Sequence, residues 1–278
     1  MKSDSITDKY KNYYEGRPNI FVLFIAHTLS LLKDGGFLAF VLPKSWTNCL
    51  YYNKLREYID NNYCILDVID CSNHSYIDTE QDTIIFIIHK TKCKNKLSLK
   101  INDQYTLFQS SSYINKIKKL LIGSTTLNKL GFDVNVGTVL WNENRKLLTN
   151  NSGKTRLIYS TDIQKGKIVY KKFDNPEKKK FISLEGVSGP IIVINRGYGT
   201  GVYQFNYALL NIDKPYLLEN HVISVSCKSN LSKKKLISLY KRVIKSFTDK
   251  RVEQFIKLYF GNSAINTTEL KYILPIYF

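Results

Sequence analysis

The chain has 278 residues, of which 44% are hydrophobic, so it can bury a sizeable core in one large domain or two ordinary ones. It contains no apolar run of about 18 residues and no apolar amino-terminal segment, which predicts no membrane span and an intracellular protein, cytoplasmic or nucleoid-associated. The five cysteines lack C-x-x-C spacing, which favours reduced thiols over a disulfide framework or a zinc site.

The net charge of +18 is unevenly distributed along the chain. Residues 1–100 carry 13 Lys and Arg against 11 Asp and Glu, whereas residues 101–278 carry 28 against 12. A strongly basic second half is typical of proteins that bind nucleic acid, because each neutralised phosphate releases counterions. A solvated, lysine-rich surface without a ligand explains the charge equally well, and the charge alone leaves both interpretations open.

The chain begins with a polar segment, and a helix is predicted to start at Asn19. Gly35 and Gly36 supply the left-handed residue that ends this helix. A strand at 37–42, FLAFVL, follows without a polar residue. Such a strand is normally buried on both sides, which predicts the interior of a parallel sheet with helices above and below. The expected inward face of the helix consists of Ile20, Phe21, Phe24, Leu29, Leu31 and Leu32.

Further elements are predicted up to about residue 122. They are a short helix at 51–61, strands at 64–69 and 83–89, a weak strand at 97–101 and a lysine-bearing helix at 111–122. Three or four strands and two helices cannot cover both faces of a parallel sheet. Either the sheet is unusually small or more strands come from another polypeptide, and we favour the second explanation.

Beyond about residue 126, short β-like runs separated by Gly, Asn and Pro replace the helical periodicity. Strands are predicted at 132–139, 157–159, 168–170, 190–195, 202–207 and 222–225. Two helices follow, at 233–246 and 249–260, and the first is basic on one face. This texture predicts a separate β-rich module.

The order of segments resembles the adenine-N6 DNA methyltransferases with a carboxyl-terminal target-recognition domain, the TaqI-like group found in type II and type IIG restriction-modification. The resemblance is carried by FIAHTLSLLKDGGFLAFVLPKSW, by the later KLREYI, and more weakly by IYSTDIQKGKIVY, IIVINRGYGTGVYQF and KLYFGNSAINTTELKYILPI. It implies an α/β fold, with a partial Rossmann-like methyltransferase sheet followed by a β-rich α+β target-recognition domain. The implied boundaries are 1–110 for the sheet, 111–125 for a linker helix and 126–278 for the recognition domain.

Two hallmarks of this family are missing from the chain. The glycine loop that holds S-adenosylmethionine and the D/N/S-P-P-Y/F/W motif would both lie before residue 1. Asn175 and Pro176 form the only Asn-Pro pair, and no second proline follows. The resemblance therefore implies a split enzyme that needs a companion chain, with double-stranded DNA as substrate and S-adenosylmethionine as methyl donor. The alternatives are a non-catalytic DNA-binding specificity subunit, a truncated remnant, or a basic structural protein.

The resemblance also implies roles for three residues of the first half. Phe24 matches the position that packs on the adenine ring of the donor, and Pro43 lies at the strand end that faces the donor. Tyr76 matches the aromatic that stacks on the flipped-out adenine, since stacking recovers part of the cost of flipping. The alternatives are a core phenylalanine on an amphipathic helix and an ordinary loop tyrosine.

In the basic half, the candidates for DNA contact lie in a glycine-rich turn and on either side of the predicted strand in QKGKIVY. Arg196, Tyr198 and Thr200 lie in NRGYGTG, where glycines allow close approach to DNA and Arg can pair with a guanine edge. A glycine-rich hairpin without base contact is the alternative. Phosphate contacts are expected from Lys165, Lys167, Lys171 and Lys172. Because His74 and His89 have no partner at ligand spacing, we expect no metal site.

Overall fold

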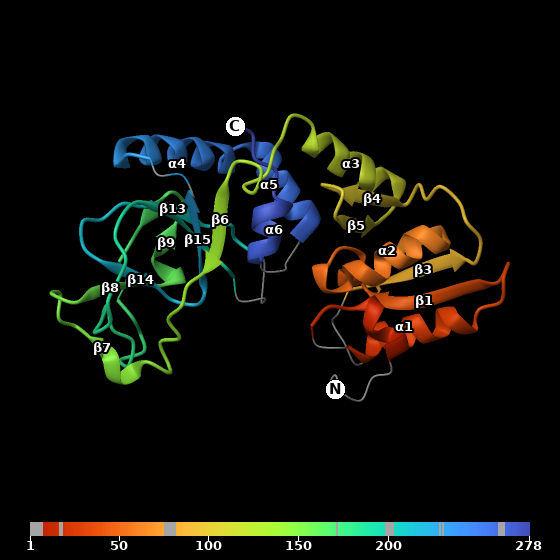
Figure 1. Ribbon diagram of the computed structural model, residues 1–278, viewed down its shortest axis with the longest axis horizontal. Helices are drawn as coiled ribbons and strands as arrows, with labels where there is room; N and C mark the ends of the chain where they lie inside the picture. The colour runs from red at the N-terminus through yellow and green to blue at the C-terminus, as the bar shows by residue number, and fades with distance from the viewer. Residues whose placement is uncertain are drawn as a thin grey trace. The chain divides into compact units, whose positions relative to one another are not determined.

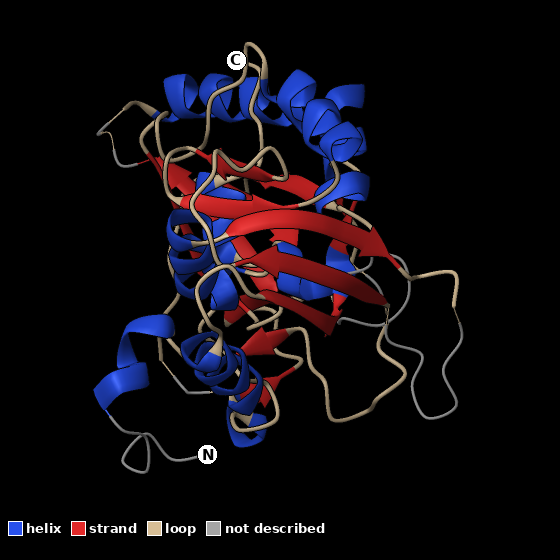
Figure 2. Cartoon of the chain, turned by 90° about the vertical axis from the view of Figure 1, so that its right-hand side faces the viewer, coloured by secondary structure: helices blue, strands red, loops and turns tan. Residues whose placement is uncertain are grey.

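The computed structural model describes residues 8–16, 19–74, 82–170, 172–197, 203–227, 229, 231–260 and 265–278. The chain forms two compact units, Met1–Lys119 and Leu120–Phe278. Helix α3 (Ser111–Leu121) occupies the stretch where one unit gives way to the other. Both units mix helices and strands (Figure 2), so the α/β class expected from the sequence is confirmed at this level.

The first unit is built on a small antiparallel sheet of β1 (Phe37–Pro43), β2 (Cys64–Asp70) and β3 (Thr83–His89). The order is β1-β3-β2, with β3 antiparallel to both neighbours, and Figure 1 shows β1 beside β3. The predicted strand positions are therefore right, but the expected pairing is wrong. Among the described residues β1 pairs only with β3, so it is an edge strand and not the interior of a parallel sheet.

Helices α1 (Ile20–Leu31) and α2 (Asn53–Asn62) cover one face of this sheet. Their buried side chains form a single core with alternate residues of the strands, among them Phe40, Phe86 and Val68. The intervening strand residues point the other way, and Phe37 and Val41 are 66% and 64% exposed. The expectation of helices above and below the sheet is thus wrong for the described residues, because both helices pack on the same side.

Helix α1 buries a different face from the one expected. Val22, Ile25 and Leu29 point into the core, whereas Ile20, Phe24 and Leu31 are 72%, 63% and 68% exposed. The helix is apolar on nearly all sides, so its sequence does not indicate which side faces the sheet. The exposed residues form a stripe at helical spacing.

The turn between α1 and β1 also differs in detail from the prediction. The last helical residue is Leu31, because the backbone of Leu32 is already extended. Asn19 caps the start of the helix, since its side chain accepts a hydrogen bond from the Phe21 amide. Gly35 has φ of +74° and its amide bonds to the Lys90 carbonyl at 3.0 Å. The left-handed glycine therefore shapes the entry to β1 and does not cap the helix.

The link from β1 to α2 is a pair of short 3-10 helices, Lys44–Thr47 and Leu50–Tyr52, held by a buried arginine. Arg56 is fully buried, and its Nε donates to the carbonyl of Thr106 at 2.6 Å. Its Nη1 donates to the carbonyls of Trp46 at 2.7 Å and Cys49 at 2.9 Å. Arg56 thus joins the link to a second hairpin, β4 (Ser98–Ile101) with β5 (Tyr105–Phe108).

The cysteine prediction requires a correction, because Cys64 and Cys93 form a disulfide. Cys64 lies opposite His89 in the sheet, so the chain leaving β3 passes close to the start of β2. Asn95 holds this returning loop in place. Its Oδ1 accepts from the Ile65 amide at 2.7 Å, and its Nδ2 donates to the backbone carbonyl of Tyr63. Strand pairing brings the two thiols together, which spacing in the sequence does not indicate. Cys49, Cys71 and Cys227 take no part in a disulfide.

Among its described residues, the second unit contains two four-stranded sheets and a short hairpin. The first sheet has the order β13-β12-β15-β6 and is antiparallel throughout. The second has the order β14-β8-β11-β7, with β14 and β8 parallel. The strands are β6 (Phe132–Val136), β7 (Leu148–Thr149), β8 (Thr155–Ile158), β9 (Ile163–Gln164), β10 (Lys167–Ile168), β11 (Phe181–Ile182), β12 (Ile191–Asn195), β13 (Tyr207–Leu210), β14 (Tyr216–Leu218) and β15 (Val222–Cys227).

Three helices complete this unit (Figure 1). They are α4 (Lys233–Phe247), α5 (Lys250–Phe255), which continues as a π-helical turn over Ile256–Phe260, and α6 (Thr267–Tyr272). The two predicted helices are confirmed within a few residues, whereas α6 and strands β5, β7, β9, β11 and β14 were not expected. These elements are short, so they have too few residues to show a period.

Candidate nucleic-acid interface

A groove of ≈ 960 Å³ lies on the second unit, between three segments that are distant in sequence. The first segment is the β9–β10 hairpin, the second is the loop 172–178, and the third is the end of β12 with residues 204–206. Four lysines and one carboxylate, that of Asp174, line the groove, so it is cationic. A groove with this charge suits a polyanion.

Three of the four lysines predicted to contact phosphate are lining residues of this groove. Lys165 and Lys167 are exposed on either side of Gly166, whose φ of +78° makes the hairpin turn tight. The Gly166 amide donates to the carbonyl of Tyr207 at 2.8 Å, which ties the turn to β13. Lys172 lies on the facing loop. Lys171, the fourth, lies outside the described residues.

A further lysine of the groove, Lys178, is held by aromatic rings. Its Nζ lies 4.9 Å from the ring centre of Trp141 and 5.4 Å from that of Tyr159. Such cation–π contacts orient an ammonium group without neutralising it. The sequence offered no signal for this arrangement, because the two rings come from other parts of the chain.

Amide side chains form the remaining polar wall. Asn195 donates from Nδ2 to the Gln204 carbonyl at 2.9 Å, and its Oδ1 accepts from the Asn206 amide at 2.7 Å. The Tyr203 hydroxyl donates to the Asn195 carbonyl at 2.8 Å. These bonds hold residues 203–206 beside the end of β12, although this stretch, predicted as a strand, is not one.

Arg196, predicted to read a base edge, is exposed at the end of β12, and its amide donates to the His221 carbonyl at 3.0 Å. It lies next to Asn195 in sequence but is not among the residues that line the groove. Tyr198 and Thr200 lie outside the described residues. Among the residues that are described, His, Cys, Asp and Glu side chains form no group of three or more able to hold a metal.

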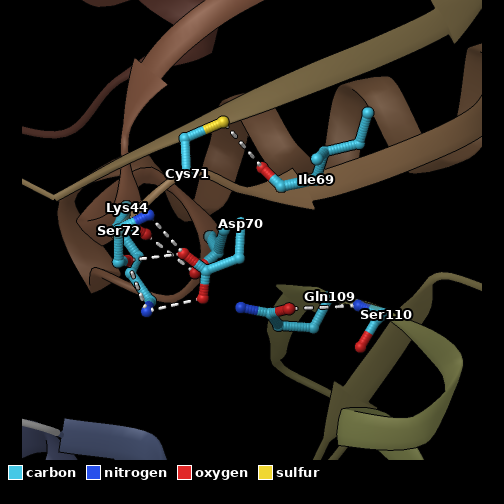
Figure 3. A network of polar contacts seen from close by, with 8 residues as sticks. Lys44, Ile69, Asp70, Cys71, Ser72, Gln109 and Ser110 are labelled. Carbon is cyan, nitrogen blue, oxygen red and sulfur yellow. Dashed lines mark hydrogen bonds and ion pairs between the residues drawn. The ribbon is translucent and has the colours of Figure 1, made fainter. Parts of the chain in front are cut away.

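In the first unit, a polar network surrounds the ends of β1 and β2 (Figure 3). Lys44 follows Pro43, and its Nζ donates to Asp70 Oδ2 at 2.7 Å and to the Ser72 hydroxyl at 2.9 Å. Burial raises the pKa of Asp70, but the hydrogen bonds from Lys44 and Ser72 outweigh it and hold the pKa below the usual range. The Lys44 amide donates to the Asp82 carbonyl at 2.8 Å, so this network also holds the start of β3.

Pro43 itself pairs with Thr83 and is half-buried at the last position of β1. Trp46, three residues later, is fully buried. Its ring lies 5.8 Å from that of Phe21, which brings the first turn of α1 to the carboxyl end of β1. Phe24 is one turn further along α1 and is exposed, so the alternative of a core phenylalanine is wrong. Tyr76 lies outside the described residues.

Comparison with known proteins finds a similarity to one family model in the first part of the chain. Residues 1–77 match the Eco57I restriction-modification methylase family. The matched stretch includes α1, β1, α2 and β2. No helix among the described residues is long and apolar enough to cross a membrane.

Curated relatives extend the similarity over most of the chain. The type II methyltransferase M.CvrRI of Paramecium bursaria Chlorella virus XZ-6E is 25% identical over 88% of this chain and 61% of its own length. M.BsuBI of Bacillus subtilis is 21% identical over 91% of this chain and 58% of its own. The chain is thus a relative of type II methyltransferases and spans about three-fifths of their length.

Among solved structures, the type IIG restriction endonuclease BpuSI can be aligned with this chain. The alignment covers 95% of this chain and 42% of the BpuSI chain. The TM-score is 0.35 at 11% identity.

Proposed function

We propose that this chain is the carboxyl-terminal and recognition portion of a site-specific adenine-N6 DNA methyltransferase. In this proposal, residues 1–110 form part of the methyltransferase domain, 111–125 a linker, and 126–278 the target-recognition domain. The observation that carries the proposal is the cationic groove, which Lys165, Lys167 and Lys172 line together. The chain that bears this groove is similar to type II methyltransferases.

The groove is the proposed contact with double-stranded DNA. Exposed lysines on two facing loops can neutralise phosphates on either side of a bound strand. Arg196, with Tyr198 and Thr200 after it, extends the proposed contact along the glycine-rich turn, and Lys171 adds a phosphate contact next to Lys172.

A salt titration tests the DNA contact. The affinity of the full chain for duplex DNA should fall linearly with the logarithm of salt concentration, with a slope of about −0.9 per phosphate contacted. Replacing Lys165 and Lys167 together by Gln should reduce that slope by about two contacts. As a matched control, Gln at Lys146 and Lys154, exposed in the same unit outside the groove, should leave the slope nearly unchanged. A salt-independent affinity would favour a basic structural protein instead.

The first unit is the proposed donor side. We infer that Phe24 packs on the adenine ring of S-adenosylmethionine, that Pro43 lies at the donor-facing strand end, and that Tyr76 stacks on the flipped adenine. The 63% exposure of Phe24 supports this, since an aromatic face in solvent is available to a ligand. The methyl transfer itself needs positioning of the donor and the adenine amino group, without a metal.

A companion chain is proposed to carry the donor loop and the D/N/S-P-P-Y/F/W motif. The position of β1 at the sheet edge supports it, since among the described residues β1 pairs with β3 on one side only, and an edge strand presents amide and carbonyl groups that another strand can bind. In an intracellular restriction-modification system, the two chains would assemble one active site.

Methyl transfer from labelled S-adenosylmethionine to DNA tests the split. The purified chain should transfer none, and adding a candidate companion that carries both motifs should restore transfer. Methylation by the chain alone would overturn the companion. The alternative, a non-catalytic specificity subunit or truncated remnant, predicts DNA binding with no transfer under either condition.

A further inference from the structure

Three amide side chains that line the groove remain available to a ligand. They belong to Gln164, Gln204 and Asn206. Within the described part of the chain, none of these three side-chain amides forms a hydrogen bond to the protein, although the Asn206 backbone does. Gln164 and Asn206 are half-buried and Gln204 is exposed, so all three reach solvent from the groove.

Local structure directs these side chains into the groove. Gln204 and Asn206 alternate in sequence with Phe205 and Tyr207, and only the two amides line the groove. The rings of Phe205 and Tyr207 each lie 5.2 Å from that of Phe247 on α4. The aromatic contacts therefore fix the orientation of the two amides.

Hydrogen bonds hold the backbone that carries the amides. Asn195 bonds to residues 204 and 206 through both polar atoms of its side chain, at 2.9 and 2.7 Å. The hairpin that carries Gln164 is tied to Tyr207 through Gly166. A preorganised set of donors and acceptors loses less entropy on binding than a mobile one.

A side-chain amide offers one donor and one acceptor side by side. This pair matches the acceptor N7 and the donor N6 of adenine in the major groove, whereas guanine presents two acceptors and suits Arg or Lys. We propose that Gln164, Gln204 and Asn206 read adenine edges in the recognition sequence, while the lysines around them hold the phosphates. This inference rests on the proposed DNA contact and assigns its base-specific part.

Selection from a duplex pool with a randomised central window tests the assignment. The full chain is incubated with the pool, and bound DNA is separated and sequenced. Wild-type protein should enrich adenine at defined positions. Gln164→Ala, Gln204→Ala or Asn206→Ala should each reduce the preference for adenine at one position by about 5- to 100-fold.

Two further variants separate readout from general affinity. Gln204→Glu replaces the donor by a second acceptor and should move the preference at its position from adenine toward cytosine, whose N4 donates. Lys165→Gln should weaken binding to all sequences about equally. Asn150→Ala, an exposed amide outside the groove, is the matched control and should change neither quantity.

The outcomes distinguish this inference from the function on which it rests. The wild-type chain could bind DNA in a salt-dependent way while all three alanine variants keep the wild-type preference for adenine. That result would overturn the amide readout alone. Binding without any base preference would do the same. Absence of DNA binding by the wild-type chain would overturn both proposals, and a melting curve of each variant shows that it is folded.

Discussion

Arg56 illustrates how a residue of the recognised KLREYI motif acts in the structure. It is fully buried and donates to three carbonyls, those of Trp46, Cys49 and Thr106. Guanidinium suits this place because its donors spread in one plane, whereas an ammonium group is a single point charge. The motif arginine is therefore a structural residue that links the β1–α2 connection to the β4–β5 hairpin.

We predict that Arg56→Met lowers the free energy of unfolding by at least about 2 kcal/mol, since the carbonyls of Trp46 and Thr106 lose a buried donor at about 1–3 kcal/mol each, whereas the Cys49 carbonyl keeps the Tyr52 amide. Arg56→Lys should recover only part of this loss. Urea denaturation measures both. Lys54→Met, which removes an exposed lysine paired with Glu15 at 3.3 Å, should cost less than about 1 kcal/mol. Equal losses at positions 54 and 56 would contradict the role given to Arg56.

At the scale of a single element, helix α6 begins with a reciprocal cap. The Glu269 amide donates to Asn266 Oδ1 at 2.9 Å, and the Asn266 amide donates to Glu269 Oε2 at 3.1 Å. Burial raises the pKa of Glu269 to about 7, although the bonds from Asn266 act in the opposite direction. The carboxyl therefore binds a proton more readily in the folded protein than in the unfolded chain.

This shift predicts that stability falls as pH rises from about 4.5, the ordinary value for Glu, to about 7. Within that window the folded state binds more protons, so raising the pH favours unfolding. Glu269→Gln keeps a capping side chain without the charge and should flatten this part of the pH profile. Thermal unfolding from pH 4 to 8 compares the two proteins. If the stability of the variant fell with pH as steeply as that of the wild type, a group other than Glu269 would cause the pH dependence.

For the whole molecule, positive charge is concentrated in one part of the chain, and an uncovered apolar face of sheet and helix lies in another. Excess positive charge lies in residues 101–278, which include the groove, while the uncovered sheet face and α1 stripe lie in the first unit. An uncovered apolar surface on a soluble domain typically marks an interaction site. The two units thus offer different surfaces, one suited to a polyanion and one to a protein.

We predict that Val41→Lys, on the uncovered face of β1, leaves the stability of the isolated chain within about 0.5 kcal/mol but abolishes its association with the proposed companion. The side chain is 64% exposed, so a lysine there costs little until another polypeptide covers it. Val41→Ile is the matched control. Co-purification from cells that express both chains is the readout, and unchanged association of the lysine variant would exclude this face as the interface.

The sequence by itself determined the positions of the longer elements. Hydrophobic periodicity and apolar runs indicate which neighbouring residues are buried, and both can be seen within a short segment. Helices α1 to α4 and strands β1 to β3 lie within a few residues of their predicted places. The lysines that flank the QKGKIVY segment were predicted to contact phosphate, and three of the four line one groove. In these cases the signal lies within a few consecutive residues.

Only the tertiary structure decided which surfaces face one another. Helix α1 is apolar all round, so packing alone selected Val22, Ile25 and Leu29 for the core and left Phe24 exposed. Antiparallel pairing of β2 with β3 brought Cys64 to Cys93, and Asn195 brought Gln204 and Asn206 to the groove. These relations join residues about 9 to 29 positions apart through hydrogen bonds and packing, and no local period records them.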